Sequence, residues 1–236
     1  MPILSVIVPA YNEETNIPIL IKRVTKALSG VDYELIIVDD GSIDNTADVA
    51  KKLEDRHPIR VIRHEHNKGK IEALKTGLQA ARGEFIAFLD ADMEYPPEAL
   101  PTMLQKAIQG HDLVAAVRVD TRPFHRRIVS SGARHLAKLV IHKLRRYKDP
   151  TTEMILAKRD LILQIDLKKN YIKPFIPVLL AAKNPAEVEI RLSCRNSGKS
   201  SFRLKWILMY LHELLDLQLA NKSHKPRGTY EEARRN

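Results

Sequence analysis

The stretch Glu84-Phe85-Ile86-Ala87-Phe88-Leu89-Asp90-Ala91-Asp92 is a short apolar run that ends in two carboxylates. A run of this length and composition predicts a buried β-strand. Four further runs of the same kind cover residues 3–8, 34–38, 60–63 and 112–117. Helical patterns separate the first four strands, over residues 15–28, 46–53 and 71–81. This alternation predicts an α/β fold, with a mainly parallel, Rossmann-like central sheet flanked by helices.

Polar residues stand at the carboxyl ends of these strands, where open parallel sheets bind their ligands. The segments there are Pro9-Ala10-Tyr11-Asn12-Glu13, Asp39-Asp40-Gly41-Ser42, Asp90-Ala91-Asp92 and Arg118. Two carboxylates as close as Asp90 and Asp92 repel each other unless a cation lies between them. Mg²⁺ or Mn²⁺ removes that cost by joining carboxylates to substrate phosphates. The sequence therefore predicts a metal-diphosphate site at this edge.

Asp39 and Asp40 point in opposite directions if they are extended, so at most one of them faces a ligand. We expect Asp40 to be that residue, and Asp39 to cap the turn through Gly41 and Ser42. Other assignments stay open at this point: Tyr11 can pack a turn, Asn12-Glu13 can cap the next helix, and Arg118 can pair with a carboxylate.

The chain has 236 residues, a net charge of +10 and a single cysteine, which excludes an internal disulfide. We expect three regions: a catalytic domain over 1–205, an amphipathic helix over 206–220 that can lie on a membrane surface, and a polar basic tail over 221–236. The apolar stretch 206–219 is too short and too charged to predict a transmembrane span. Residues 1–4 run directly into a strand, so no signal peptide is predicted.

The positive charge is concentrated in residues 118–148, which include a predicted helix over 130–146. Nucleic acid, anionic lipid and phosphorylated substrates all suit such a surface. We predict no nucleic-acid binding, because no base-stacking aromatic platform accompanies the charge. A late strand over 187–192 precedes a second basic group.

Four motifs in order resemble glycosyltransferase family two, which has the GT-A fold. They are Pro9-Ala10-Tyr11-Asn12-Glu13, Val38-Asp39-Asp40-Gly41-Ser42, Asn67-Lys68-Gly69-Lys70 with Ala73 and Gly77, and Asp90-Ala91-Asp92. The resemblance implies a sugar-nucleotide pocket formed by Pro9, Tyr11, Glu13, Val38 and Asp40. It places Asp90 and Ala91 near the ribose and implies that Asp92 holds the metal on the diphosphate.

Within the family, the chain is most similar to dolichyl-phosphate mannose synthases. This similarity implies that Arg118 contacts the donor and acts in catalysis, with Arg195 and Lys199 of a late loop beside it. It also implies that Arg127, Ser131 and Arg134 bind the acceptor phosphate, and that Glu94 is a second metal ligand. The chain departs from the pattern at Thr152-Glu153-Met154, and Ser201 stands in place of a loop lysine.

The resemblance implies an inverting transfer from a nucleotide sugar, GDP-mannose or a UDP-sugar, to a polyprenyl or dolichyl phosphate. A lipid phosphate is already ionised and needs cations, whereas a hydroxyl acceptor needs a general base. Glu153 is a candidate for that base, so a sugar-hydroxyl acceptor stays open. A third alternative is a non-catalytic sugar-nucleotide-binding subunit with a membrane-protein partner. The expected location is peripheral, at the cytoplasmic face of a membrane.

Overall fold

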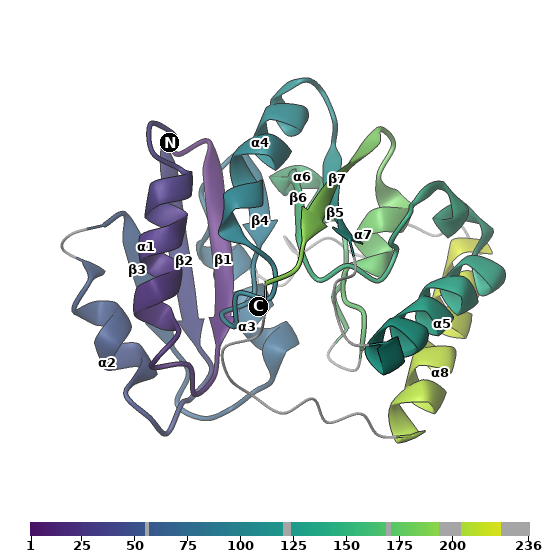
Figure 1. Cartoon of the computed structure of the whole chain (residues 1–236), viewed down its shortest axis with the longest axis horizontal. Coiled ribbons are helices and arrows are strands. Elements are labelled where there is room, and N and C mark those ends of the chain that lie inside the picture. The colour runs from purple at the N-terminus through teal and green to yellow at the C-terminus, as the bar shows by residue number, and fades with distance from the viewer. Residues whose placement is uncertain (55–56, 120–123, 169–170, 194–203, 223–236) are drawn as a thin grey trace, which may run out of the picture.

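The computed structural model describes residues 1–54, 57–119, 124–168, 171–193 and 204–222 (Figure 1). Seven strands form one sheet in the order β3-β2-β1-β4-β6-β5-β7. The strands are β1 (Leu4–Ala10), β2 (Tyr33–Asp39), β3 (Ile59–Arg63), β4 (Phe85–Phe88), β5 (Leu113–Val119), β6 (Ile155–Lys158) and β7 (Pro185–Arg191). All pairings are parallel except those of β6 with β4 and β5. The sheet is thus mainly parallel, as predicted.

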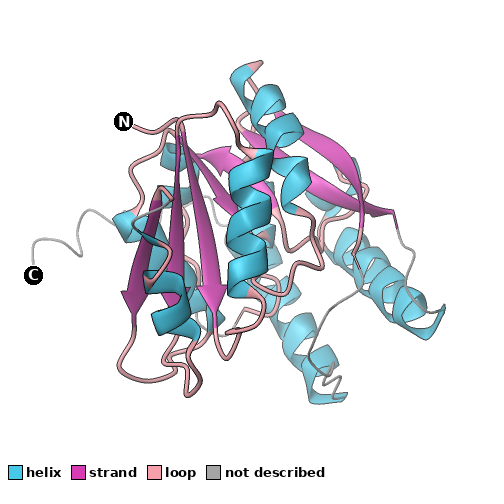
Figure 2. Ribbon diagram, turned by 60° about the vertical axis from the view of Figure 1, so that its left-hand side comes forward, coloured by secondary structure: helices cyan, strands magenta, loops and turns pink. Residues whose placement is uncertain are grey.

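Helices cover both faces of the sheet (Figure 2). They are α1 (Ile17–Ala27), α2 (Thr46–Lys51), α3 (Lys70–Ala80), α4 (Leu100–Ile108), α5 (Phe124–Val140), α6 (Arg159–Leu163), α7 (Ile176–Ala181) and α8 (Leu204–Lys222). The described residues also include the short 3₁₀ helices η2 (Pro97–Ala99) and η3 (His142–Arg146). The β/α alternation predicted for the first half is confirmed, with element ends shifted by one to two residues at most positions.

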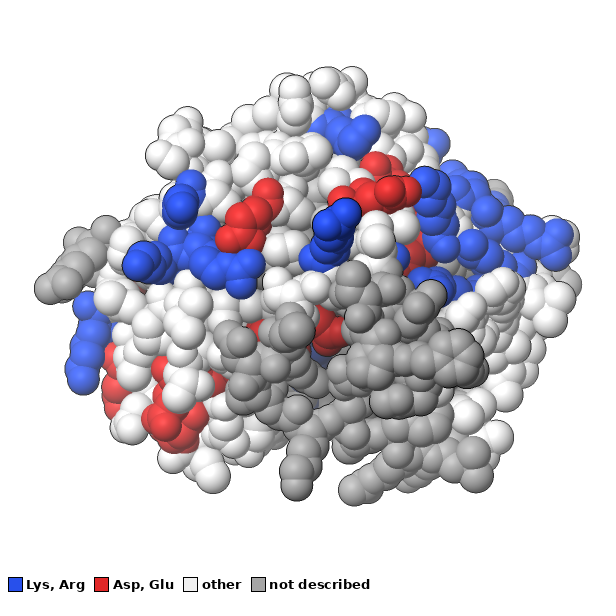
Figure 3. Space-filling model, in the orientation of Figure 1, with Lys and Arg blue, Asp and Glu red and all other residues white. Residues whose placement is uncertain are grey.

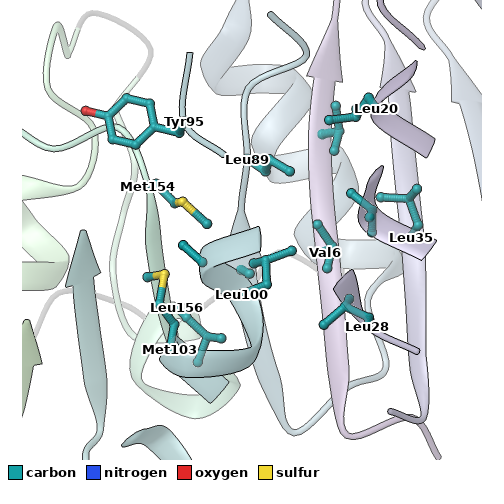
Figure 4. Packing of buried hydrophobic residues seen from close by; sticks show 14 of the residues in the cluster. Val6, Leu20, Leu28, Leu35, Leu89, Tyr95, Leu100, Met103, Met154 and Leu156 are labelled. Atoms are coloured by element: carbon teal, nitrogen blue, oxygen red, sulfur yellow. The ribbon is translucent and has the colours of Figure 1, made fainter. Parts of the chain in front are cut away.

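Side chains of β1 alternate between two hydrophobic clusters, because successive residues of a strand face opposite sides of a sheet. Leu4, Val6 and Val8 pack with α1 and α4, and Ile7 packs with α3 on the other face. Figure 4 shows part of the first cluster, where Leu20 of α1, Leu28 just after that helix, and Leu100 and Met103 of α4 lie against the sheet. In α1 the apolar spacing of 3.6 residues per turn places Ile17, Leu20, Ile21 and Val24 in the core.

Two predictions for the second half differ from the structure. The helix expected over 130–146 is α5, which begins at Phe124 and ends at Val140, followed by Ile141 and η3. Ile141 has an extended backbone, which turns the chain so that Ile141, Leu144 and Tyr147 are all buried. The antiparallel strand β6 was not predicted, because four apolar residues in a row do not distinguish a strand from other buried segments.

The helix expected over 206–219 is α8, and it lies beside α5 at one edge of the molecule (Figure 1). The hydroxyl of Tyr210 donates a hydrogen bond to the carbonyl of Ala133 on α5, at 3.3 Å. None of the helices in the described ranges is long and apolar enough to cross a membrane. The predicted tail over 221–236 falls almost entirely outside the described residues.

Candidate active site

The sheet order places β2, β1 and β4 side by side, so the segments that follow them start at one edge. Ala10 of β1 pairs with Asp39 of β2, and Ile7 of β1 pairs with Phe88 of β4. The Tyr11, Asp40 and Asp90 segments, which are separated by up to 80 residues in the chain, therefore lie together. The sequence predicts this convergence of the three segments at one edge of the sheet.

Hydrogen bonds connect the loop after β1 to the loop after β2. The amide of Asn12 donates to Ser42 Oγ at 2.9 Å, and the amide of Ile43 donates to Asn12 Oδ1 at 3.0 Å. Asn12 itself has a positive φ of 57°. Tyr11 beside it is 44% exposed. The ring of Tyr11 is thus presented to solvent rather than packed in the turn, where it can stack on a flat ligand.

Glu13 takes part in the start of α1. Its carboxylate accepts a hydrogen bond from Asn16 Nδ2 at 2.6 Å, and its carbonyl accepts the amide of Ile17 at 3.0 Å. Its amide donates to Thr46 Oγ1 at 2.8 Å. The helix-capping alternative for Glu13 is therefore present in the structure, and its contact with a nucleotide stays a prediction.

Asp39 and Asp40 are both buried and have different partners. Asp39 Oδ1 accepts the amide of Ser42 at 3.2 Å, which is the predicted cap of the turn. Asp40 accepts the amides of Lys68 and Gly69 at 2.9 and 2.7 Å, and lies 2.7 Å from His64 Nδ1. The Asp40 carboxylate thus fixes the loop that leads into α3. Any contact between Asp40 and a nucleotide stays a prediction.

Gly69 and Gly77 explain why Asn67 to Gly77 acts as a helix start and packing element. Gly69 precedes α3 with a φ of 97°. At Gly77 an added Cβ would lie 2.4 Å from Cγ2 of Ile7, so only glycine lets α3 approach β1 this closely.

Four charged side chains form a cluster at the same edge: Asp90, Lys70, Glu153 and Lys173. Lys70 Nζ lies 2.8 and 2.9 Å from the two carboxylate oxygens of Asp90 and 3.2 Å from Glu153 Oε2. Lys173 Nζ donates to the other oxygen of Glu153. The sequence analysis gave neither lysine a role in the site, although Lys70 lies within the Asn67-Lys68-Gly69-Lys70 motif. We refer to these four residues as the Lys70–Glu153 cluster.

The pKa values of the two carboxylates in this cluster are shifted in opposite directions. Burial raises the pKa of Asp90, and Glu153 and Asp92 add to this rise against the opposing charge of Lys70. Burial also acts to raise the pKa of Glu153, but Lys173 and Lys70 outweigh it and lower that pKa to about 2. Glu153 is therefore an anion at neutral pH with two cations as counter-ions.

The predicted metal ligands, Asp92 and Glu94, follow β4 directly. Asp92 is buried, and its Oδ1 accepts the amide of Glu94 at 3.0 Å. Within the described ranges, no group of three or more His, Cys, Asp or Glu side chains is arranged to hold a metal. Two hard carboxylates still fit Mg²⁺ or Mn²⁺, because these ions are commonly bound by one or two carboxylates together with substrate phosphates and water.

Arg118 is buried and bound to Asp149. Its Nε and Nη2 donate to the two Asp149 oxygens at 2.6 and 2.9 Å, and Nη2 also donates to Thr151 Oγ1 at 2.6 Å. Burial acts to raise the pKa of Asp149, but the hydrogen bonds and charge of Arg118 lower it overall. The alternative of a pairing with a carboxylate is thus present, although that carboxylate is buried. A donor contact of Arg118 stays a prediction.

The predicted acceptor residues belong to α5, and one of them, Arg134, lies near the same aspartate. Arg134 Nη1 is 3.9 Å from Asp149 Oδ2. Ser131 Oγ lies 3.3 Å from His135 Nδ1, one turn further along the helix. Arg127 belongs to α5, but its side chain is outside the described part of the chain, and Arg195, Lys199 and Ser201 lie outside the described residues. Sequence analysis did not identify Asp149, whose carboxylate contacts both Arg118 of β5 and Arg134 of α5.

Comparisons with known proteins identify the family of the chain. The model of the family "Glycosyl transferase family 2" matches residues 5–170. A dolichol-phosphate mannosyltransferase of Pyrococcus furiosus is 31% identical, over 91% of this chain and 63% of its own length. An undecaprenyl-phosphate 4-deoxy-4-formamido-L-arabinose transferase of Shewanella sediminis is also 31% identical, over 90% of this chain and 65% of its own length. The chain thus spans less than two thirds of the length of these two relatives.

Solved structures agree on the fold. Glucosyl-3-phosphoglycerate synthase from Mycobacterium tuberculosis, in complex with Mn²⁺, UDP and glucosyl-3-phosphoglycerate, has a TM-score of 0.72 at 24% identity, over 93% of this chain and 80% of its own. Another structure of that enzyme gives a TM-score of 0.70 at 25% identity over the same shares. The chain therefore belongs to glycosyl transferase family 2 and has the GT-A fold.

Proposed function

We propose that this protein is an inverting glycosyltransferase that moves a sugar from a nucleotide donor to a polyprenyl phosphate. GDP-mannose is the proposed donor and dolichyl phosphate or a related polyprenyl phosphate the acceptor. The two relatives described above are named for transfer to dolichol phosphate and undecaprenyl phosphate. Their names support the acceptor class, and the first supports the sugar.

The acceptor assignment rests on the ionisation of Glu153 and on its two lysine partners. A hydroxyl acceptor needs a general base whose pKa is near the working pH. Glu153, the candidate for that base, is held by Lys70 and Lys173, and its pKa is lowered to about 2. A carboxylate this weakly basic is poorly suited to remove a hydroxyl proton. A phosphate acceptor is already ionised and needs no base, so it fits this site better.

The proposed reaction is one in-line displacement at the anomeric carbon, in which the phosphate oxygen of the acceptor attacks and the nucleoside diphosphate leaves. Asp92 and Glu94 would hold a divalent metal, which stabilises the charge of the leaving diphosphate when bound. Tyr11 would stack on the base, and Asp90, which is paired with Lys70, would bind the ribose. Arg127, Ser131 and Arg134 of α5 would bind the acceptor phosphate.

The edge formed by α5 and α8 supports an association with a membrane surface. The side chains of Leu208, Leu215 and Leu219 on α8 are 67%, 54% and 66% exposed, and their spacing places them on one side of the helix. Lys and Arg side chains gather along the α5 edge of the molecule in Figure 3. Lys143 and Arg145 of η3, which follows α5, are exposed. We propose a peripheral location at the cytoplasmic face, alone or with a membrane-protein partner.

Glu153→Gln separates the two acceptor classes. Transfer from GDP-mannose to a short polyprenyl phosphate should persist, with kcat within about tenfold of wild type, because no base is removed. Loss of about 10²-fold or more, together with loss of the acidic limb of the pH profile, would instead identify Glu153 as a base and favour a hydroxyl acceptor.

A thermal-shift panel tests the donor site without relying on activity. GDP-, UDP- and dTDP-sugars are compared with and without Mn²⁺, in the wild type and in Asp92→Asn. We expect GDP-mannose with Mn²⁺ to raise the unfolding midpoint of the wild type, and to raise it less in the variant. Equal responses of the two proteins would contradict the metal-diphosphate assignment.

A further inference from the structure

A surface cavity of about 340 Å³ lies at the opposite edge of the sheet from the candidate active site. Its lining includes Arg60 of β3, Arg82 between α3 and β4, Arg159 at the start of α6, and the end of α3 at Ala80 and Ala81. These are the amino ends of the parallel strands and the carboxyl end of the antiparallel strand β6 (Figure 1). Three arginines from distant parts of the sequence therefore meet at one hollow.

The three guanidinium groups of this cavity have no carboxylate paired with them among the described residues. No ion pair joins Arg60, Arg82 or Arg159 to a carboxylate in the part of the chain that the structure describes. The Nε atom of Arg159 is buried and has no hydrogen-bond partner. A buried donor without a partner costs about 1–3 kcal/mol, so such groups usually indicate a missing partner.

Hydrogen bonds fix the backbone at Arg159 and Arg82 and the guanidinium of Arg60. The amide of Arg159 donates to the carbonyl of Glu84 at 2.9 Å. The amide of Arg82 donates to Glu34 Oε1 at 2.6 Å, and Arg60 Nη1 donates to the carbonyl of Ala80 at 3.3 Å. The contact of Arg60 also satisfies one carbonyl at the end of α3. The end of a helix carries only about half a negative charge, which three guanidinium groups outweigh.

We propose that this cavity binds a small phosphorylated anion, such as a diphosphate or a sugar phosphate. Guanidinium groups present planar pairs of N–H donors that match phosphate oxygens. The volume is at the lower end of the range of about 300–1,000 Å³ that is usual for small-molecule sites. The site is separate from the donor site because it lies at the amino edge of the sheet, whereas Asp90 and Asp92 lie at the carboxyl edge.

Calorimetric titration of the full chain with pyrophosphate, in the presence of EDTA, tests this proposal. Wild type should bind one pyrophosphate, and Arg159→Met and Arg60→Met should each bind it about tenfold more weakly or worse, as expected for the loss of a charge-assisted contact. Lys51→Met on α2 removes one exposed positive charge elsewhere and should bind like wild type. The unfolding midpoint without anion shows that each variant is folded.

Two further experiments identify the site that binds the anion and the source of the phosphate. Asp92→Asn should retain wild-type binding, and loss of binding in it would assign the anion to the donor site and overturn the proposal. Equal affinity in Arg159→Met, Arg60→Met and Lys51→Met would also overturn it. Vesicles with phosphatidic acid are compared with soluble pyrophosphate. Binding that depends on Arg159 for vesicles only would show a lipid headgroup site instead of a site for a small anion.

Discussion

Arg118 and Asp149 form a buried pair in which two guanidinium nitrogens donate to both carboxylate oxygens, at 2.6 and 2.9 Å. Asp149 also lies 3.9 Å from Arg134 of α5, so one carboxylate connects the end of β5 to the basic helix. The positions of the proposed donor and acceptor residues therefore depend on the same pair.

Removing one member of this pair should destabilise the protein strongly. Arg118→Met and Asp149→Asn each leave a buried group without its partner, at a cost of about 3–5 kcal/mol in the free energy of unfolding. The double variant Arg118→Met/Asp149→Asn should lose less stability than the sum of the two single losses, because no unpaired charge remains. Urea denaturation measures all four proteins. Additive losses would show that the two residues act independently.

The Lys70–Glu153 cluster should contribute to donor binding. In Lys70→Met, Asp90 loses its cation while Glu153 and Asp92 remain near it, so we expect the KM for the nucleotide sugar to rise by about tenfold, more than kcat falls. Lys75→Met, on the same helix, removes a lysine that pairs with Glu72 and serves as the control.

A double-mutant cycle checks that Lys70 acts with Glu153. Lys70→Met and Glu153→Gln should show a coupling energy of about 0.5–3 kcal/mol in donor binding, since the side chains are in contact. A coupling energy of zero, or a KM in Lys75→Met that rises as much as in Lys70→Met, would contradict this role.

Gly41 and Gly30 provide a matched pair for backbone strain. Both have a positive φ, 70° and 82°, but an added Cβ at Gly41 would lie 2.5 Å from the backbone of His66, whereas at Gly30 it would meet nothing within 4 Å. Gly30→Ala should cost about 1–2 kcal/mol from the left-handed conformation alone. Gly41→Ala should cost clearly more, because the loop at His66 has to move. Thermal unfolding of both variants compares them, and equal costs would show that the loop yields freely.

Glu213 on α8 predicts a pH-dependent stability. It is buried and accepts the amides of Ile172 and Lys173, at 2.7 and 3.2 Å. Burial raises its pKa to about 7 from an ordinary value of 4.5. Between these values the folded protein holds a proton that the unfolded chain has released. The contribution of Glu213 to stability is therefore complete below pH 4.5 and is lost as the pH rises towards 7.

Glu213→Gln should remove this part of the pH dependence. The difference in unfolding free energy between wild type and variant should change by up to about 3 kcal/mol across the window, and stay constant above it. Urea denaturation at a series of pH values measures the difference. Parallel pH profiles for the two proteins would show that Glu213 titrates in the folded state as it does in the unfolded chain.

The order of strands and helices in the first half, the edge that forms the site and the family could all be predicted from the sequence. Apolar periodicity reports which residues are buried, and the polar segments after the strands meet because parallel strands end at one edge. The same reasoning predicted that Asp39 caps the turn at Ser42, since that contact spans three residues.

Only the tertiary structure decided which charges meet. Lys70 and Glu153 are 83 residues apart, and Arg118 and Asp149 are 31 apart. These contacts depend on β6, which enters the sheet antiparallel between β4 and β5 and brings the 149–154 segment beside the acidic edge. A local pattern carries no information on such a pairing, because its energy comes from burying distant charges together. For that reason Glu153, a candidate base in the sequence, is the counter-ion of two lysines in the fold.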